Sequence, residues 1–203
     1  MTDPSVDTTD RDTRCVNLNS NYAYFAIVGM GSQTLHPLTV TSLYSKVVIP
    51  TVLYGCEMWN NLSKKDLCNL QIFQHLVVKH IQVMHRRTRS DMCETMLDLP
   101  RLTVVVEERK SMFLQKLCQI ESNILSKQIF TFRLFQYLLS PDLKQLGFIP
   151  DIIGILQKYS LSSHLIHYIF TWNFPSNFSW KNSINNTIND FEHEAKLIKN
   201  GRR

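Results

Sequence analysis

The chain has 203 residues, of which 44% are apolar, so it is long enough for one domain or two small ones and too apolar for wholesale disorder. Its 6 Gly and 7 Pro residues follow no period, and its 5 Cys residues form no Cys-x-x-Cys pair, which excludes collagen-like arrays, a disulfide framework and a zinc ribbon. The net charge of +5 fits an anionic partner, most commonly nucleic acid, and equally fits a role in solubility alone.

The first residues differ in character from the rest of the chain. Residues 1–16 are poor in apolar groups and rich in Asp and Thr, which predicts a disordered leader. The start lacks the positive residues and apolar run of a secretory signal, and the two long uncharged stretches are interrupted by polar residues. We therefore expect an intracellular protein, cytoplasmic or nuclear, with no membrane partner.

The segment between Val47 and Tyr54 admits two interpretations. Leu43, Val47 and Val48 have helical spacing, and Pro50 would kink such a helix because proline lacks an N–H and crowds the preceding turn. The β-branched runs on either side of Pro50 are also typical of a strand. We predict an all-α fold, mainly a helical bundle, and allow a short β element between Val47 and Tyr54.

Apolar periodicity predicts helices along the rest of the chain. The clearest covers residues 64–84, where apolar side chains recur at steps of three and four. Further helices are expected at about 90–97, 103–124, 125–139, 152–159, 162–170 and 177–199. We divide the chain into the leader 1–16, a helical region 17–100 and a second helical region 101–203.

No pattern in the sequence predicts a catalytic or metal site. His75, His80 and His85 follow at intervals of five residues, about 140° around a helix, so they do not share a face. Asp10 and Asp12 form an Asp-x-Asp pair of the kind that binds Mg²⁺, but nothing in the leader would hold their geometry. We expect a protein that is not an enzyme and has no metal and no cofactor.

The strongest local signal is a basic run at the predicted end of the 64–84 helix. No acidic residue occurs between Asp66 and Asp91, and the same interval contains four cations, Lys79, Arg86, Arg87 and Arg89. Cations at a helix C-terminus are also stabilised by the helix dipole, an explanation that needs no ligand. Because arginine binds phosphate in a bidentate manner and the cluster exceeds what a cap requires, we favour contact with a nucleic-acid backbone.

A longer pattern runs from Leu43 to Trp59. It reads Leu-Tyr-Ser-Lys, an apolar run, Pro and then Leu-Tyr-Gly-Cys-Glu-Met-Trp, with the informative positions Tyr44, Lys46, Pro50, Leu53, Tyr54, Gly55, Glu57 and Trp59. This pattern resembles the segment downstream of the polymerase active site in non-LTR retrotransposon reverse transcriptases, with Ser45 inserted. The likeness covers roughly residues 17–117.

The resemblance implies the thumb and the region after it, so residues 17–100 would be thumb-like and residues 101–203 post-thumb. In that family a thumb helix packs along the template–primer duplex. The resemblance therefore implies that Lys79, Arg86, Arg87 and Arg89 contact the nucleic-acid backbone. Lys64 and Lys65 are weaker candidates. The aromatic-Ala-Asp-Asp turn that holds the catalytic metals in the family's palm does not occur in the sequence.

The expected function is that of a non-catalytic C-terminal fragment of a reverse transcriptase, which contacts RNA or RNA/DNA duplex without sequence preference. Two alternatives stay open. In the first alternative, the chain is a helical relic or interaction protein without nucleic-acid activity, which self-associates through exposed apolar surface. Alternatively, it is part of an RNA-directed DNA polymerase whose fingers and palm lie on a missing upstream segment.

Overall fold

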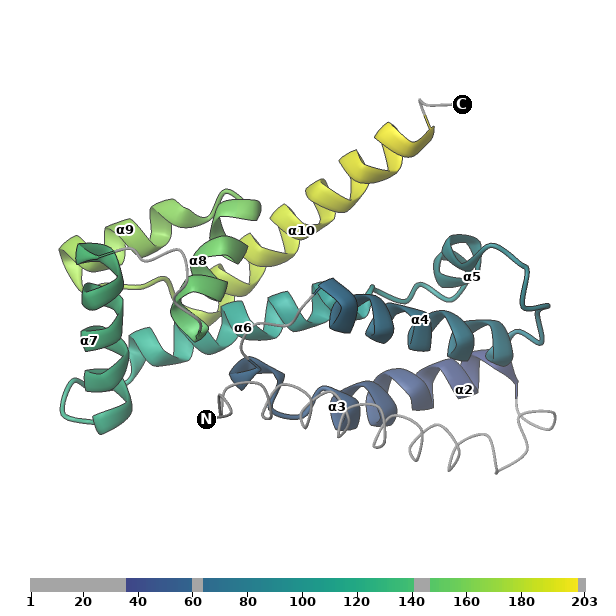
Figure 1. Ribbon diagram of the computed structural model, residues 1–203, viewed down its shortest axis with the longest axis horizontal. Coiled ribbons are helices and arrows are strands. Elements are labelled where there is room, and N and C mark those ends of the chain that lie inside the picture. Colours follow the sequence, from purple (N-terminus) through teal and green to yellow (C-terminus); the bar gives the residue numbers. More distant parts are fainter. Residues whose placement is uncertain (1–35, 60–63, 141–146, 201–203) are drawn as a thin grey trace, which may run out of the picture. The chain divides into compact units, whose positions relative to one another are not determined.

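The computed structural model describes residues 36–59, 64–140 and 147–200, except for the side chains of residues 64 and 192–200. Every regular element in these ranges is a helix, which confirms the all-α prediction (Figure 1). The predicted leader, residues 1–16, lies outside the described residues. The elements are α2 Pro37–Leu43, η1 Tyr44–Val48, α3 Ile49–Val52, η2 Cys56–Met58, α4 Lys64–Ile81, α5 Ser90–Met96, α6 Leu102–Gln119, α7 Leu125–Leu139, α8 Phe148–Lys158, α9 Ser162–Thr171 and α10 Asn177–Asn200.

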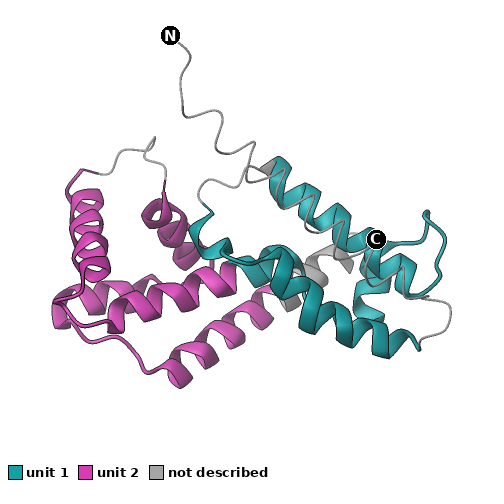
Figure 2. Ribbon diagram, turned by 90° about the horizontal axis from the view of Figure 1, so that it is seen from below, with its two compact units in different colours: residues 1–106 teal, residues 107–203 magenta. Residues whose placement is uncertain are grey.

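These helices belong to two compact units, which we call unit 1 (residues 1–106) and unit 2 (residues 107–203) (Figure 2). The division falls within α6. Unit 1 contains the described helices from α2 to α5 and the first turn of α6. Unit 2 contains the rest of α6 and the helices α7 to α10.

The segment between Val47 and Tyr54 is not a strand, so the β element that we allowed there is wrong. Its first part belongs to η1, a turn of π-helix in which the Ile49 N–H donates to the Tyr44 carbonyl, and α3 follows directly. Pro50 has no N–H to donate to the preceding turn, and a π-turn accommodates such a local disruption. Burial of one face of this run outweighs the weak β propensity of its β-branched residues.

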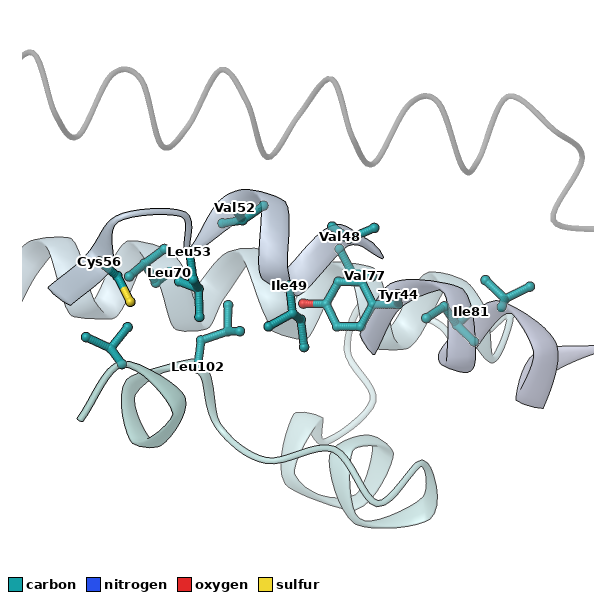
Figure 3. Close-up of a cluster of buried hydrophobic side chains, with 12 residues drawn as sticks. Tyr44, Val48, Ile49, Val52, Leu53, Cys56, Leu70, Val77, Ile81 and Leu102 are labelled. Atoms are coloured by element: carbon teal, nitrogen blue, oxygen red, sulfur yellow. The ribbon is translucent and has the colours of Figure 1, made fainter. Parts of the chain in front are cut away.

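The core of unit 1 lies between the α2–α3 run, α4 and the start of α6 (Figure 3). The inner face of α4 contributes Leu70, Val77 and Ile81, which belong to the apolar stripe that predicted this helix. Gln74, on the same helix, is fully buried: its amide donates to the Pro100 carbonyl at 2.7 Å, and its oxygen accepts from the Leu102 N–H at 2.9 Å. This side chain therefore satisfies an otherwise unpaired N–H at the start of α6.

The core of unit 2 surrounds Trp180 of α10. Its indole Nε1 donates to the Ser111 carbonyl of α6 at 2.9 Å, and its ring meets Phe174 and His164 edge-on at centroid distances of 4.9 and 5.3 Å. The buried polar end of the indole is thus paired, as burial requires. Trp180 is fully buried and is a core residue of unit 2.

Candidate nucleic-acid interface

The candidate interface lies where α4 ends, three residues earlier than the apolar periodicity predicts. The Met84 N–H donates to the Lys79 carbonyl at 2.8 Å and the Val83 N–H donates to the His80 carbonyl at 3.1 Å. This pair of bonds is the Schellman closure of a helix C-terminus, in which one residue turns into the left-handed region. Here that residue is Val83, with φ of 53°.

A short loop connects α4 to α5 and contains Arg86 and Arg87 (Figure 1). The ring Nδ1 of His85 accepts from the Arg87 N–H at 3.2 Å, and the His85 carbonyl accepts from the Thr88 N–H at 2.9 Å. Lys79 of α4 braces the loop, because its Nζ donates to the Arg86 carbonyl at 2.9 Å. We call residues 83–89 the α4 tip.

Arg86 and Arg87 are both exposed on the α4 tip. Within the part of the chain that the structure describes, neither guanidinium contacts a carboxylate. Two adjacent guanidiniums in solvent, without a local counter-ion, are available to an external anion. Their planar donors match the geometry of a phosphodiester.

Arg89 differs from its neighbours because it has a carboxylate partner. Its Nε donates to Asp91 Oδ1 at 3.1 Å, and its terminal nitrogen contacts the other carboxylate oxygen. The hydrogen bond from Arg89 holds the pKa of Asp91 below its ordinary value. The sequence-based view of four cations without a neutralising acid therefore needs correction at Arg89, whose charge is locally balanced.

The structure separates Lys64 and Lys65 from the α4 tip. Both lie in the first turn of α4, and Lys65 is exposed, whereas the side chain of Lys64 is outside the described residues. Lys79 lies 14 positions after Lys65, so the two residues are about 20 Å apart along the helix axis. One phosphate group cannot contact both, so the structure brings together Lys79 and the three arginines alone.

Two polar contacts hold α5 against α4 and the residue that follows it. Gln82 Nε2 donates to the Cys93 carbonyl at 2.7 Å, and Gln71 Nε2 donates to the buried Glu94 carboxylate at 2.6 Å. The same carboxylate oxygen lies 3.2 Å from His75 Nε2. Burial, followed by the charges of Lys79 and Arg101, lowers the pKa of His75.

Glu94 is a positioning residue that the sequence patterns do not predict. The available signal was its place in the predicted 90–97 helix, beside Cys93 and on the side that also carries Leu97. An acid on the inner side of a short amphipathic helix requires a polar partner on the neighbouring helix. Gln71 supplies that partner.

Other kinds of site find no support in the described residues. Among them, no three His, Cys, Asp or Glu side chains are placed to hold a metal ion. No described helix has both the length and the apolarity of a bilayer span. No family model, curated protein or solved structure matches this chain. We therefore infer function from the geometry of the α4 tip and from the sequence resemblance.

Proposed function

We propose that this chain is a non-catalytic, thumb-like module that contacts the sugar-phosphate backbone of RNA or RNA/DNA duplex without sequence preference. We further propose that it derives from the C-terminal region of a non-LTR retrotransposon reverse transcriptase. The observation that carries the proposal is the pair Arg86 and Arg87, exposed on the α4 tip without a carboxylate contact in the described part of the chain. Such cations release condensed counter-ions when they meet phosphates, which drives binding that ignores sequence.

The α4 tip suits a polyanion for two further reasons. The Lys79 ammonium donates to the Arg86 carbonyl, so its positive charge lies against the backbone of the loop that carries Arg86 and Arg87. The carbonyls of Lys79 and His80 are already paired with N–H groups of the turn, which reduces the exposed negative end of the helix dipole. Phosphate contact would therefore come from side chains and would depend strongly on salt.

The experiment is a salt titration of the affinity for a labelled RNA/DNA hybrid, followed by fluorescence anisotropy. Two or three neutralised phosphates give a slope of log K against log salt of about −2 to −3. The double variant Arg86→Gln/Arg87→Gln should reduce this slope by about 2, and a hybrid of scrambled sequence should bind the unaltered chain equally well.

A matched double variant controls for net charge. Lys116→Gln/Arg133→Gln also removes two exposed positive charges, but from α6 and α7 of unit 2. We expect its salt slope to equal that of the unaltered chain. Equal losses in both double variants would show a diffuse charge effect and would contradict a defined interface at the α4 tip.

A second candidate function, an interaction protein that self-associates, is favoured by α7. This helix exposes Leu125, Ile129, Phe132 and Leu139, the last to 82% of its full area. Apolar side chains at such helical spacing are typical of a covered face. Sedimentation velocity over a range of concentrations tests this, and Phe132→Gln should shift any oligomer toward monomer.

The polymerase alternative has a direct test as well. Primer extension on an RNA template by the purified chain should yield no product, because the sequence lacks the aromatic-Ala-Asp-Asp turn of the family's palm. Template-dependent extension that survives repeated purification would overturn the non-catalytic proposal.

A further inference from the structure

We propose that Val83 and Met84, next to Arg86 and Arg87, form an apolar wedge that enters the base stack where a duplex is interrupted. This rests on the proposed function and names its substrate class: duplexes with an unstacked step, such as a bulge, a gap or an end. The arginines would bind the flanking phosphates while the wedge contacts the exposed base faces. Continuous duplex would then be the weaker ligand.

The first support is the exposure of this apolar pair. Val83 is 83% exposed and Met84 is 41% exposed, on the same α4 tip that carries Arg86 and Arg87, whose guanidiniums contact no carboxylate among the described residues. Proteins that kink or open duplexes combine arginines with aliphatic side chains inserted between base steps. The α4 tip places both kinds of side chain within five consecutive residues.

The second support is the backbone of Val83. Its φ of 53° lies in the left-handed region, which β-branched residues adopt rarely and which glycine favours at this position of the helix end. With its side chain in solvent, packing within the fold does not compensate for the strain. A strained and exposed valine is therefore a reason to look for a binding role.

Three other described non-glycine residues also have a left-handed backbone, and for each of them this conformation has a simpler explanation. Asp98 and Ser160 are small and polar, which lowers the cost of the left-handed conformation. Trp172 packs against Tyr168 and Phe135 at centroid distances of 5.8 and 6.2 Å. Val83 alone among the four is β-branched.

The third support is that transferring the wedge out of water costs little free energy. The N–H groups of Val83 and Met84 are both donated to carbonyls of α4. Inserting this turn into a base stack therefore leaves neither N–H group without a hydrogen-bond acceptor. A membrane is a poorer fit, because interfacial anchors need a long apolar helix face or a larger polybasic cluster.

The test compares an RNA/DNA hybrid hairpin that carries a single-nucleotide bulge with the same hairpin without the bulge. An apolar contact with one unstacked base should give the unaltered chain about fivefold tighter binding to the bulged form. Val83→Gly should remove this preference, keep the salt slope and raise the melting temperature. A merely structural role cannot lower binding while raising stability.

Ser160→Gly is the matched control, because it also relieves a left-handed residue without changing charge. It should raise the melting temperature and keep the bulge preference, and Met84→Ser should weaken that preference independently of Val83. A preference that survives Val83→Gly, or equal affinity of the unaltered chain for both hairpins, overturns the wedge alone. No salt-dependent binding to either hairpin overturns the proposed function and the wedge together. In a parallel assay, the unaltered chain is mixed with anionic phosphatidylserine vesicles. Binding to them that is lost with Val83→Gly would assign the wedge to a membrane and overturn its role in base stacks.

Discussion

Replacing Lys127 with methionine should remove the polar cap that closes α6 in unit 2. The side chain is only 6% exposed, and its Nζ donates to the carbonyls of Leu117 and Cys118 at 3.0 and 2.6 Å. A third hydrogen bond joins it to the Tyr168 hydroxyl. The two carbonyls belong to the last turn of α6, where the helix itself supplies no donor.

The expected loss follows from these contacts. Methionine keeps most of the volume of the lysine stem, so the substitution leaves little cavity. Two buried carbonyls lose their donor, at about 1–3 kcal/mol each, while the cost of burying an ammonium is relieved. We expect a net destabilisation of about 2–4 kcal/mol, which lowers the melting temperature of a unit of this size by roughly 10–20 °C.

Scanning calorimetry of the full chain measures this change. Lys116→Met provides the control, because Lys116 is an exposed lysine of α6, the helix that Lys127 caps, and its replacement should change stability by less than about 0.5 kcal/mol. If Lys127→Met is neutral or stabilising, the burial cost of the ammonium exceeds the value of its hydrogen bonds. Lys127 would then not be a stabilising cap, and our reasoning would be wrong.

Three further predictions concern unit 2. Gln115 is 1% exposed and neither of its amide atoms is hydrogen-bonded to a described residue, so Gln115→Met should stabilise by about 1–2 kcal/mol in urea denaturation, and a loss of stability would reveal a missing partner. Asp151→Asn should destabilise by about 3 kcal/mol in the same assay, because the largely buried Lys110 ammonium, 3.0 Å away, would lose the negative charge of Asp151; an unchanged midpoint would refute this. Burial raises the pKa of Cys118 from 9.0 and of Tyr168 from 10.0, both to about 12. Above pH 9 the unfolded chain releases protons that the native state keeps, so stability should fall between pH 9 and 12, and a midpoint that rises over this range would contradict the assignment.

Apolar periodicity predicts most of the helices because it reports which face of each helix is buried. Helices α5, α7, α9 and α10 end within one residue of their predicted bounds. The end of α6 is predicted five residues too late, because it ends beside Lys127, and that contact comes from another helix. The end of α4 is missed for a different reason: Val83 occupies the position where a glycine would have marked the helix end.

The candidate interface is partly predictable from the sequence. Charge counting identifies the cations, because an interval without acidic residues can be read directly from the sequence. The pairing of Arg89 with Asp91 could also have been expected from their separation of two residues. The position of the Lys79 ammonium against the Arg86 carbonyl could not, because it depends on how the turn after α4 reverses the chain.

The α4 tip departs from the local rules that the described core of unit 1 obeys. The core of the unit buries its apolar side chains, and Gln74 satisfies a helix terminus with both of its amide atoms. At the α4 tip, by contrast, a β-branched residue adopts a left-handed conformation and exposes its side chain. Such departures are expected where a protein binds something, because selection for stability alone would replace Val83 with glycine. Stability and nucleic-acid affinity should therefore change in opposite directions at position 83, and a variant there that improves both would refute the binding role.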